Sequence, residues 1–149
     1  MSLVFFTDRD LSTKVFPGEL AAKGIHVERH ADHFTQDAPD AEWIPEVAKR
    51  GWVIVSANTD MTRRSLEVDA IMRSGARVLL LVGGHQPVRV LAQNFINTRT
   101  RIERYLQRRE GALIVKVSRP SGESAVAKGE PGHVRLHLDE ASWAKRRQA

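Results

Sequence analysis

Three aspartates stand next to apolar segments of the chain and could together hold a divalent cation. Asp8 follows the apolar residues 3–6, Asp60 follows the apolar residues 52–55, and Asp40 lies between these two stretches. Neighbouring carboxylates repel one another unless a cation neutralises them. Oxygen ligands favour Mg²⁺ or Mn²⁺, and the chain has no cysteine to supply a thiolate. Such an ion can orient water and offset the charge that develops on a phosphodiester during its cleavage.

The elements around these aspartates would bring them to one place. Residues 52–55 are apolar and are bounded by Gly51 and by small polar residues, which predicts a buried strand. Strands of this kind are typical of parallel sheets that helices cover on both faces. The carboxyl ends of parallel strands meet at one edge, where ligands collect in open α/β sheets. We therefore expect Asp8 and Asp60 to be neighbours, with Asp40 at the start of a helix on the same side.

The rest of the chain alternates between predicted strands and helices. Further strands are expected over residues 25–27, 77–82 and 113–117, and helices over 11–21, 41–50, 64–74 and 87–109. This order predicts an α/β fold, a three-layer α/β/α sandwich with a mostly parallel sheet. The apolar stripes of the three later helices are expected at Trp43, Ile44, Val47 and Ala48, at Leu66, Ala70 and Ile71, and at Val88, Leu91, Phe95, Ile102 and Leu106.

Composition changes after residue 118. Residues 1–118 are predicted to form the sandwich, and residues 119–149 a C-terminal extension with a mobile linker to residue 132. Residues 134–138 alternate like an edge strand, and a basic tail ends the chain. The net charge of +5 and the pI of 10.1 favour polyanionic partners. No run of about 18 apolar residues is present, so we expect no membrane span and a cytoplasmic protein.

Three short motifs resemble those of PIN-like domains, in the right order over residues 3–85. They are Phe5-Phe6-Thr7-Asp8-Arg9-Asp10-Leu11, then Pro39-Asp40-Ala41-Glu42-Trp43-Ile44, then Gly51-Trp52-Val53-Ile54-Val55-Ser56-Ala57-Asn58-Thr59-Asp60. The resemblance is to the compact branch related to VapC-type toxin ribonucleases. It implies a Mg²⁺- or Mn²⁺-dependent endoribonuclease that cuts RNA. It also implies the toxin of a toxin–antitoxin pair, with an antitoxin protein as a partner and a homodimer as a plausible assembly.

The resemblance also implies which residues act. The catalytic and metal-ligating acids would be Asp8, Asp40 and Asp60, with Glu67 as a candidate fourth ligand and Asp69 as a weaker one. One departure concerns the serine or threonine that the family places directly before the loop of the last aspartate, which is displaced here within Ser56–Thr59. Contacts to the RNA backbone are expected from Arg9, Arg63 and Arg64.

Other functions remain open at this point. Asp40 could simply be the N-cap of a helix, and Asp8 and Asp60 could be turn residues. A receiver-like phosphoacceptor domain would use Asp8 and Asp10, with Asp60 and Lys116. A catalytically inactive PIN-like module would bind nucleic acid or a protein.

Several other residues have ordinary explanations. His26, His30 and His33 are interpreted as surface histidines, and Gly83-Gly84-His85 as a strand-to-helix turn. Trp43, Trp52 and Phe95 are expected in the core. A basic side of the long helix comprises Arg99, Arg101, Arg104, Arg108 and Arg109. It is interpreted first as a solvated face, with RNA or antitoxin contact as the alternative.

Overall fold

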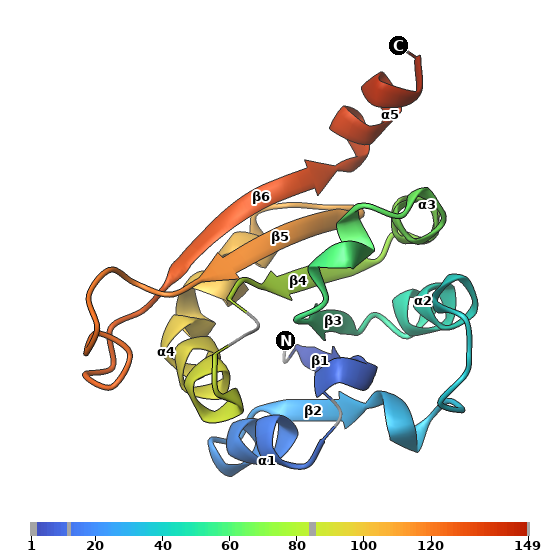
Figure 1. Ribbon diagram of the computed structural model, residues 1–149. Helices are drawn as coiled ribbons and strands as arrows, with labels where there is room; N and C mark the ends of the chain where they lie inside the picture. The colour runs from blue at the N-terminus through green and yellow to red at the C-terminus, as the bar shows by residue number, and fades with distance from the viewer. Residues whose placement is uncertain (1–2, 12, 84–85, 149) are drawn as a thin grey trace.

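The computed structural model describes residues 3–11, 13–83 and 86–148, and in them one six-stranded sheet lies between two layers of helices (Figure 1). The strands are β1 (Val4–Thr7), β2 (His26–Arg29), β3 (Val53–Ser56), β4 (Arg77–Leu81), β5 (Leu113–Ser118) and β6 (His133–Asp139). The α-helices are α1 (Val15–Ala22), α2 (Asp40–Lys49), α3 (Ser65–Ser74), α4 (Val88–Gln107) and α5 (Glu140–Gln148). Short 3₁₀ turns are η1 (Arg9–Leu11), η2 (His30–Asp32) and η3 (Thr59–Thr62). The predicted α/β sandwich is confirmed.

The strand order places a crevice between β1 and β3. The order is β2-β1-β3-β4-β5-β6, and every pair is parallel except β5 with β6. The chain leaves β1 towards β2 on one side and returns to β3 on the other. In doubly wound sheets such a reversal leaves a crevice at the carboxyl ends of the two central strands, and ligands bind there. Asp8 and residues 57–60 follow these two strands directly.

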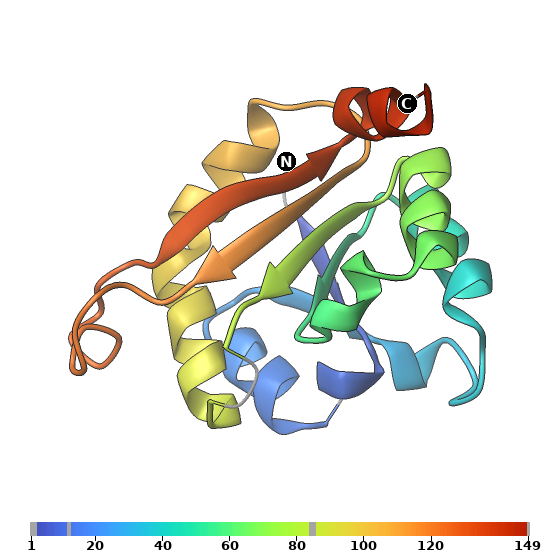
Figure 2. The ribbon, with the colours of Figure 1, turned by 45° about the horizontal axis from the view of Figure 1, so that its top comes forward.

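Two hydrophobic cores lie on the two faces of the sheet. Because side chains alternate along a strand, Phe5 of β1 points to one face and Phe6 to the other. Helices α1 and α4 cover the Phe5 face, with Phe16 and Phe95 fully buried. Helices α2 and α3 cover the Phe6 face (Figure 2). This covering on both faces explains why β3 is buried along its whole length.

Two expected core residues are exposed. Leu66 is 74% exposed because it lies five residues before the buried Ile71, which places the two about 140° apart around α3. Val88 is 37% exposed at the first position of α4, whereas the other expected residues of that stripe are buried. Trp43 and Phe95 are core residues as predicted, and Trp52 is half-buried at the edge of its cluster.

The segment from 119 to 132 differs from the predicted mobile linker. It folds into hydrogen-bonded turns, and Ala125 and Val126 are buried. Asn97 of α4 donates a hydrogen bond to the carbonyl of Val126, and the Gly132 amide donates to Thr98 Oγ1 at 2.9 Å. These contacts hold the segment against α4 and deliver the chain to β6, which forms the predicted edge strand.

The C-terminal residues form helix α5, which projects from the sheet and buries no residue fully. Its main contact is Trp143, whose Nε1 donates to Asp69 of α3 at 3.2 Å. None of the helices in the described part of the chain combines the length and apolarity needed to cross a membrane.

Candidate active site

Asp8 is a buried carboxylate at the carboxyl end of β1. Its side chain is held from three directions: the amides of Asp10 and Leu11 donate to Oδ1 at 3.1 and 3.3 Å, and Ser56 Oγ donates to Oδ2. Ser56 ends β3, and the pairing of Thr7 with Val55 places it beside Asp8. The Asn58 amide in turn donates to Ser56 Oγ at 3.0 Å. The two central strands therefore fix the orientation of this carboxylate.

Burial makes the negative charge of Asp8 costly. Desolvation raises the pKa of the Asp8 carboxyl from 3.8 to about 7, and the nearby Asp10 adds to the rise. The hydrogen bonds from Ser56 and from the backbone favour the charged form and offset only part of this effect. A cation beside Asp8 would relieve the same penalty, because an opposite charge favours the ionised carboxylate.

Asp40 begins α2 and is paired with Arg9. Arg9 Nη2 donates to Asp40 Oδ1 at 2.5 Å, and Trp43 Nε1 donates to the same oxygen at 2.9 Å. Arg9 Nη1 also donates to the carbonyls of Gln36 and Ala38. The interpretation of Asp40 as an N-cap is wrong, because Pro39 occupies that position and no side chain caps this helix.

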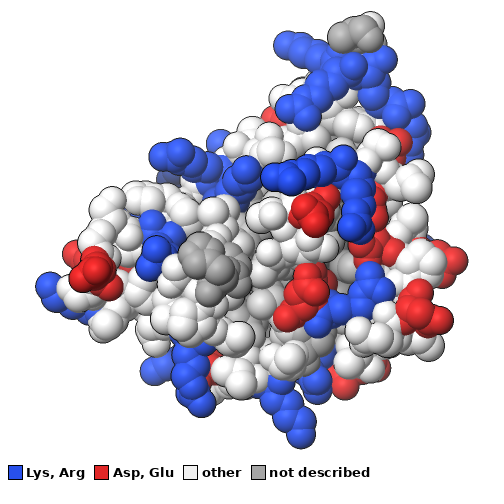
Figure 3. Space-filling model, viewed as in Figure 1, with Lys and Arg blue, Asp and Glu red and all other residues white. Residues whose placement is uncertain are grey.

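These residues line one small pocket. Its volume is about 50 Å³, which is room for one or two water-sized groups. The lining residues are Asp8, Arg9, Asp10, Asp40, Trp43, Asn58 and Met61. Figure 3 shows acidic groups near the centre of this face, with basic side chains beside them. The structure thus joins Asp8 and Asp40 as the sequence predicts, and it adds Asp10 and Asn58.

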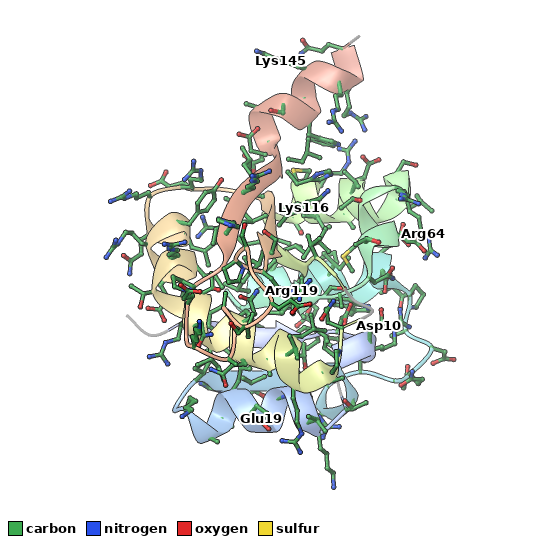
Figure 4. All side chains as sticks on the ribbon, turned by 60° about the vertical axis from the view of Figure 1, so that its left-hand side comes forward. Asp10, Glu19, Arg64, Lys116, Arg119 and Lys145 are labelled. Carbon is green, nitrogen blue, oxygen red and sulfur yellow. The ribbon has the colours of Figure 1, made fainter. Side chains whose placement is uncertain are left out.

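The other predicted acids lie outside the lining of this pocket. Asp60 is 57% exposed in η3, and Arg63 Nη1 is 3.8 Å from its carboxylate. Glu67 in α3 is paired with Arg64 at 3.7 Å. Figure 4 shows Asp10 and Arg64 on the same side of the molecule, with Lys145 far from both. Asp69 is engaged by Trp143 and by Arg147 of α5.

The donor set can be compared with what a divalent cation requires. Mg²⁺ is commonly held by one or two carboxylates, keeps several waters and is completed by substrate phosphates. The carboxylates of Asp8, Asp10 and Asp40 supply hard oxygen donors of this kind. Across the described residues, no three histidine, aspartate or glutamate side chains form a group that could hold a metal ion. The pocket therefore fits a site with one or two carboxylate ligands, and the four predicted acids do not converge.

Two site features were missed in the sequence. In the sequence Ser56 stands out only as a displaced family position. The signal for its role is a hydroxyl at the last residue of a buried strand beside β1. His30 was interpreted as a surface residue, and this is wrong. Its ring is fully buried among Phe6, Phe34 and Trp43, and among the described residues its two nitrogens have no hydrogen-bond partner.

His30 is also electrostatically linked to the pocket. Desolvation, followed by the positive charge of Arg9, lowers the pKa of His30, and Asp40 opposes this shift. His26 and His33 instead bond to Glu28 near the surface, at 2.7 and 2.8 Å. The three histidines therefore do not form a metal site. The predicted turn at Gly83-Gly84-His85 lies partly outside the described residues.

The comparisons with known proteins identify the family of the region that contains the pocket. A family model described as "PIN like domain" matches residues 3–83, which is more than half of the chain. The matched region contains every residue of the pocket. Neither the curated proteins nor the solved structures contain a match.

Proposed function

Because the chain belongs to the PIN-like domain family, we propose that it is a metal-dependent endoribonuclease that hydrolyses RNA phosphodiesters at the Asp8 pocket. The observation that carries the proposal is the placement of Asp8. A buried carboxylate that two strands orient, beside two further carboxylates at the switch point of the sheet, is costly for stability. Such costs are typical of functional sites.

The residues of the pocket would have different roles in metal binding. Asp8 and Asp40 would hold Mg²⁺ or Mn²⁺, and Ser56 would keep Asp8 aligned. When bound, such an ion orients water and neutralises charge on the scissile phosphate. The roles of Asp60 and Glu67 as further metal ligands stay predictions. Measuring the binding of Mg²⁺ to Asp60→Asn and Glu67→Gln by calorimetry would test them.

The RNA backbone would approach over the exposed arginines beside the pocket. Arg63 and Arg64 have exposed guanidinium groups close to the start of α3. Arg9, the third expected contact, is already bonded to Asp40 and to two carbonyls, so phosphate would have to compete for it.

The deciding experiment is a titration of Mg²⁺ and Mn²⁺ by calorimetry. Wild type should bind with saturation, and Asp8→Asn should not, while the matched control Asp32→Asn, an exposed aspartate outside the pocket, should behave as wild type. Cleavage of a labelled RNA should follow the same pattern. Equal metal binding and cleavage by wild type and Asp8→Asn would overturn the proposal.

A finer proposal concerns biological role. The VapC-type resemblance supports a toxin whose activity a partner antitoxin suppresses. Induced expression in a bacterial host should then arrest growth, and Asp8→Asn should relieve the arrest. Normal growth at an equal level of folded wild type would contradict this role.

The ion pair between Arg9 and Asp40 favours a second candidate, a PIN-like module that binds RNA without cleaving it. Here the guanidinium supplies the positive charge that a metal would supply in an active site. This candidate predicts RNA binding by wild type with no saturable metal binding. The calorimetric titration separates the two.

A further inference from the structure

A second cavity lies away from the Asp8 pocket, between the C-terminal half of α4 and strand β6. Its volume is about 350 Å³. Five arginines line it: Arg101 and Arg104 from α4, Arg108 and Arg109 directly after the end of α4, and Arg135 from β6. No carboxylate is among the lining residues. We call this cavity the arginine groove.

The positive charge of the arginine groove is only partly offset within the described structure, where Arg109 interacts electrostatically with Asp139. None of the five guanidinium groups forms an ion pair with a described aspartate or glutamate. The nearest contacts are of another kind: Arg101 donates to the Gly132 carbonyl at 2.8 Å, and Arg109 lies 3.7 Å from the centre of the Tyr105 ring. Elsewhere on α4, in contrast, Arg89 and Arg99 are each paired with a glutamate.

The spacing of these arginines suits a repeating anion. Arg101, Arg104 and Arg108 are three and four residues apart, so they lie along one side of α4 over about 10 Å. Arg135 adds a positive charge from β6. In the register of the sheet it lies opposite Lys116 of β5. A planar guanidinium can bind two oxygens of one phosphate at once.

We propose that the arginine groove binds the sugar-phosphate backbone of single-stranded RNA, outside the site of cleavage. The choice of RNA among polyanions rests on the proposed function, whereas the binding itself needs no catalytic activity. Nucleic-acid interfaces are more polar and much more positive than protein interfaces. The five arginines give the groove the positive charge of such an interface.

An acidic protein segment fits the groove less well. Protein interfaces have cores with few charges and with aromatic anchors. Besides the methylene groups of its arginines, the groove offers Val134 and the ring of Tyr105 as apolar surface, and Arg109 already covers one face of that ring. A protein partner would therefore find few large apolar side chains to anchor it here.

The test measures binding of a labelled single-stranded RNA in EDTA at several salt concentrations. The groove variant is Arg104→Gln/Arg108→Gln, and both positions are exposed. The matched control is Arg89→Gln/Arg99→Gln, which removes the same charge from the same helix outside the groove. The plot of log K against log salt has a negative slope. Loss of two phosphate contacts should make this slope shallower by about 1.4 in the groove variant. The control should keep the slope of wild type.

Three results would overturn the proposal: no RNA binding by wild type, equal weakening in both double variants, or displacement of the RNA by poly-glutamate at equal charge. The last would assign the groove to an acidic protein instead. A failure of the proposed ribonuclease function would give a different result. The RNA would bind in EDTA but would remain uncut in Mg²⁺.

Discussion

Asp8 shows how a single residue links stability to function in this chain. Its carboxylate is 4% exposed and accepts hydrogen bonds from two amides and one hydroxyl. These bonds orient the group without compensating for the loss of water around its charge. Aspartate at this position therefore lowers the stability of the fold at neutral pH, which a purely structural role would not explain.

The raised pKa of Asp8 predicts how stability depends on pH. Because the folded-state pKa of about 7 exceeds the unfolded value of 3.8, the folded state binds the extra proton between these values. The contribution of Asp8 to stability is full below about pH 4 and is lost as pH rises through 7, by at most roughly 4 kcal/mol. Denaturant unfolding at a series of pH values measures this loss.

Asp8→Asn supplies the comparison for that measurement. The amide keeps the size of the side chain but cannot ionise, so the fall in stability between pH 4 and 8 should become shallower by the contribution of Asp8. Identical pH profiles for the two proteins would show that Asp8 is not protonated in the folded state near neutral pH.

Arg9 provides a second prediction at the scale of the residue. Arg9→Met would remove three hydrogen bonds and leave Asp40 with only its bond from Trp43, so the free energy of unfolding should fall by about 1–3 kcal/mol. Arg63→Met, at a side chain that is 79% exposed, should change it by less than about 0.5 kcal/mol. Chemical denaturation of both variants makes the comparison, and equal losses would contradict the role given to Arg9.

The limits of sequence reasoning at this site have a physical cause. The proximity of Asp8 and Asp40 follows from the order of strands and helices, which the apolar pattern shows. The bonds of Arg9 depend on where the loop before α2 crosses the end of β1, and no local pattern encodes that crossing. The burial of His30 likewise depends on Phe6, Phe34 and Trp43 meeting from three separate segments.

Among the elements, the segment between β5 and β6 shows how packing can override composition. Glycine, serine, glutamate and lysine predict mobility, whereas Asn97 and Thr98 of α4 bind the backbone of this segment. The long helices and the buried strands were predicted to within a few residues because their apolar periodicity is repeated several times. The segment has no such repeat, so only the tertiary contacts reveal its order.

A substitution at Gly132 tests whether the segment between β5 and β6 is held in place. A Cβ atom at Gly132 would lie 2.0 Å from the Ser118 carbonyl oxygen, so Gly132→Ala should reduce stability by about 3 kcal/mol or more. A Cβ atom at Gly18 in helix α1 would lie more than 4 Å from any atom outside its chain neighbours and the backbone of the helix. Gly18→Ala should therefore raise stability by about 0.5–1 kcal/mol. Thermal unfolding compares the two, and a neutral effect at Gly132 would show that the segment is free to move.

At the scale of the whole molecule, the region that matches the family model lacks one of the helices that cover its sheet. Residues 3–83 contain the Asp8 pocket and both helices of the Phe6 face, but the Phe5 face is covered by α1 together with α4. A chain of residues 1–83 should therefore bind a hydrophobic dye and unfold without cooperativity, whereas the full chain should show one sharp transition. A cooperative calorimetric transition of the short chain would contradict this expectation.

The late position of α4 in the chain has a consequence during translation. The parts of the pocket leave the ribosome first, and the helix that seals the opposite face follows after roughly 24 more residues, which take about 1 to 5 s to synthesise. For that interval the nascent chain exposes Phe5, Phe16 and their neighbours to chaperones and to other nascent chains. Newly made protein thus exposes apolar side chains that later become core before the pocket has a rigid support.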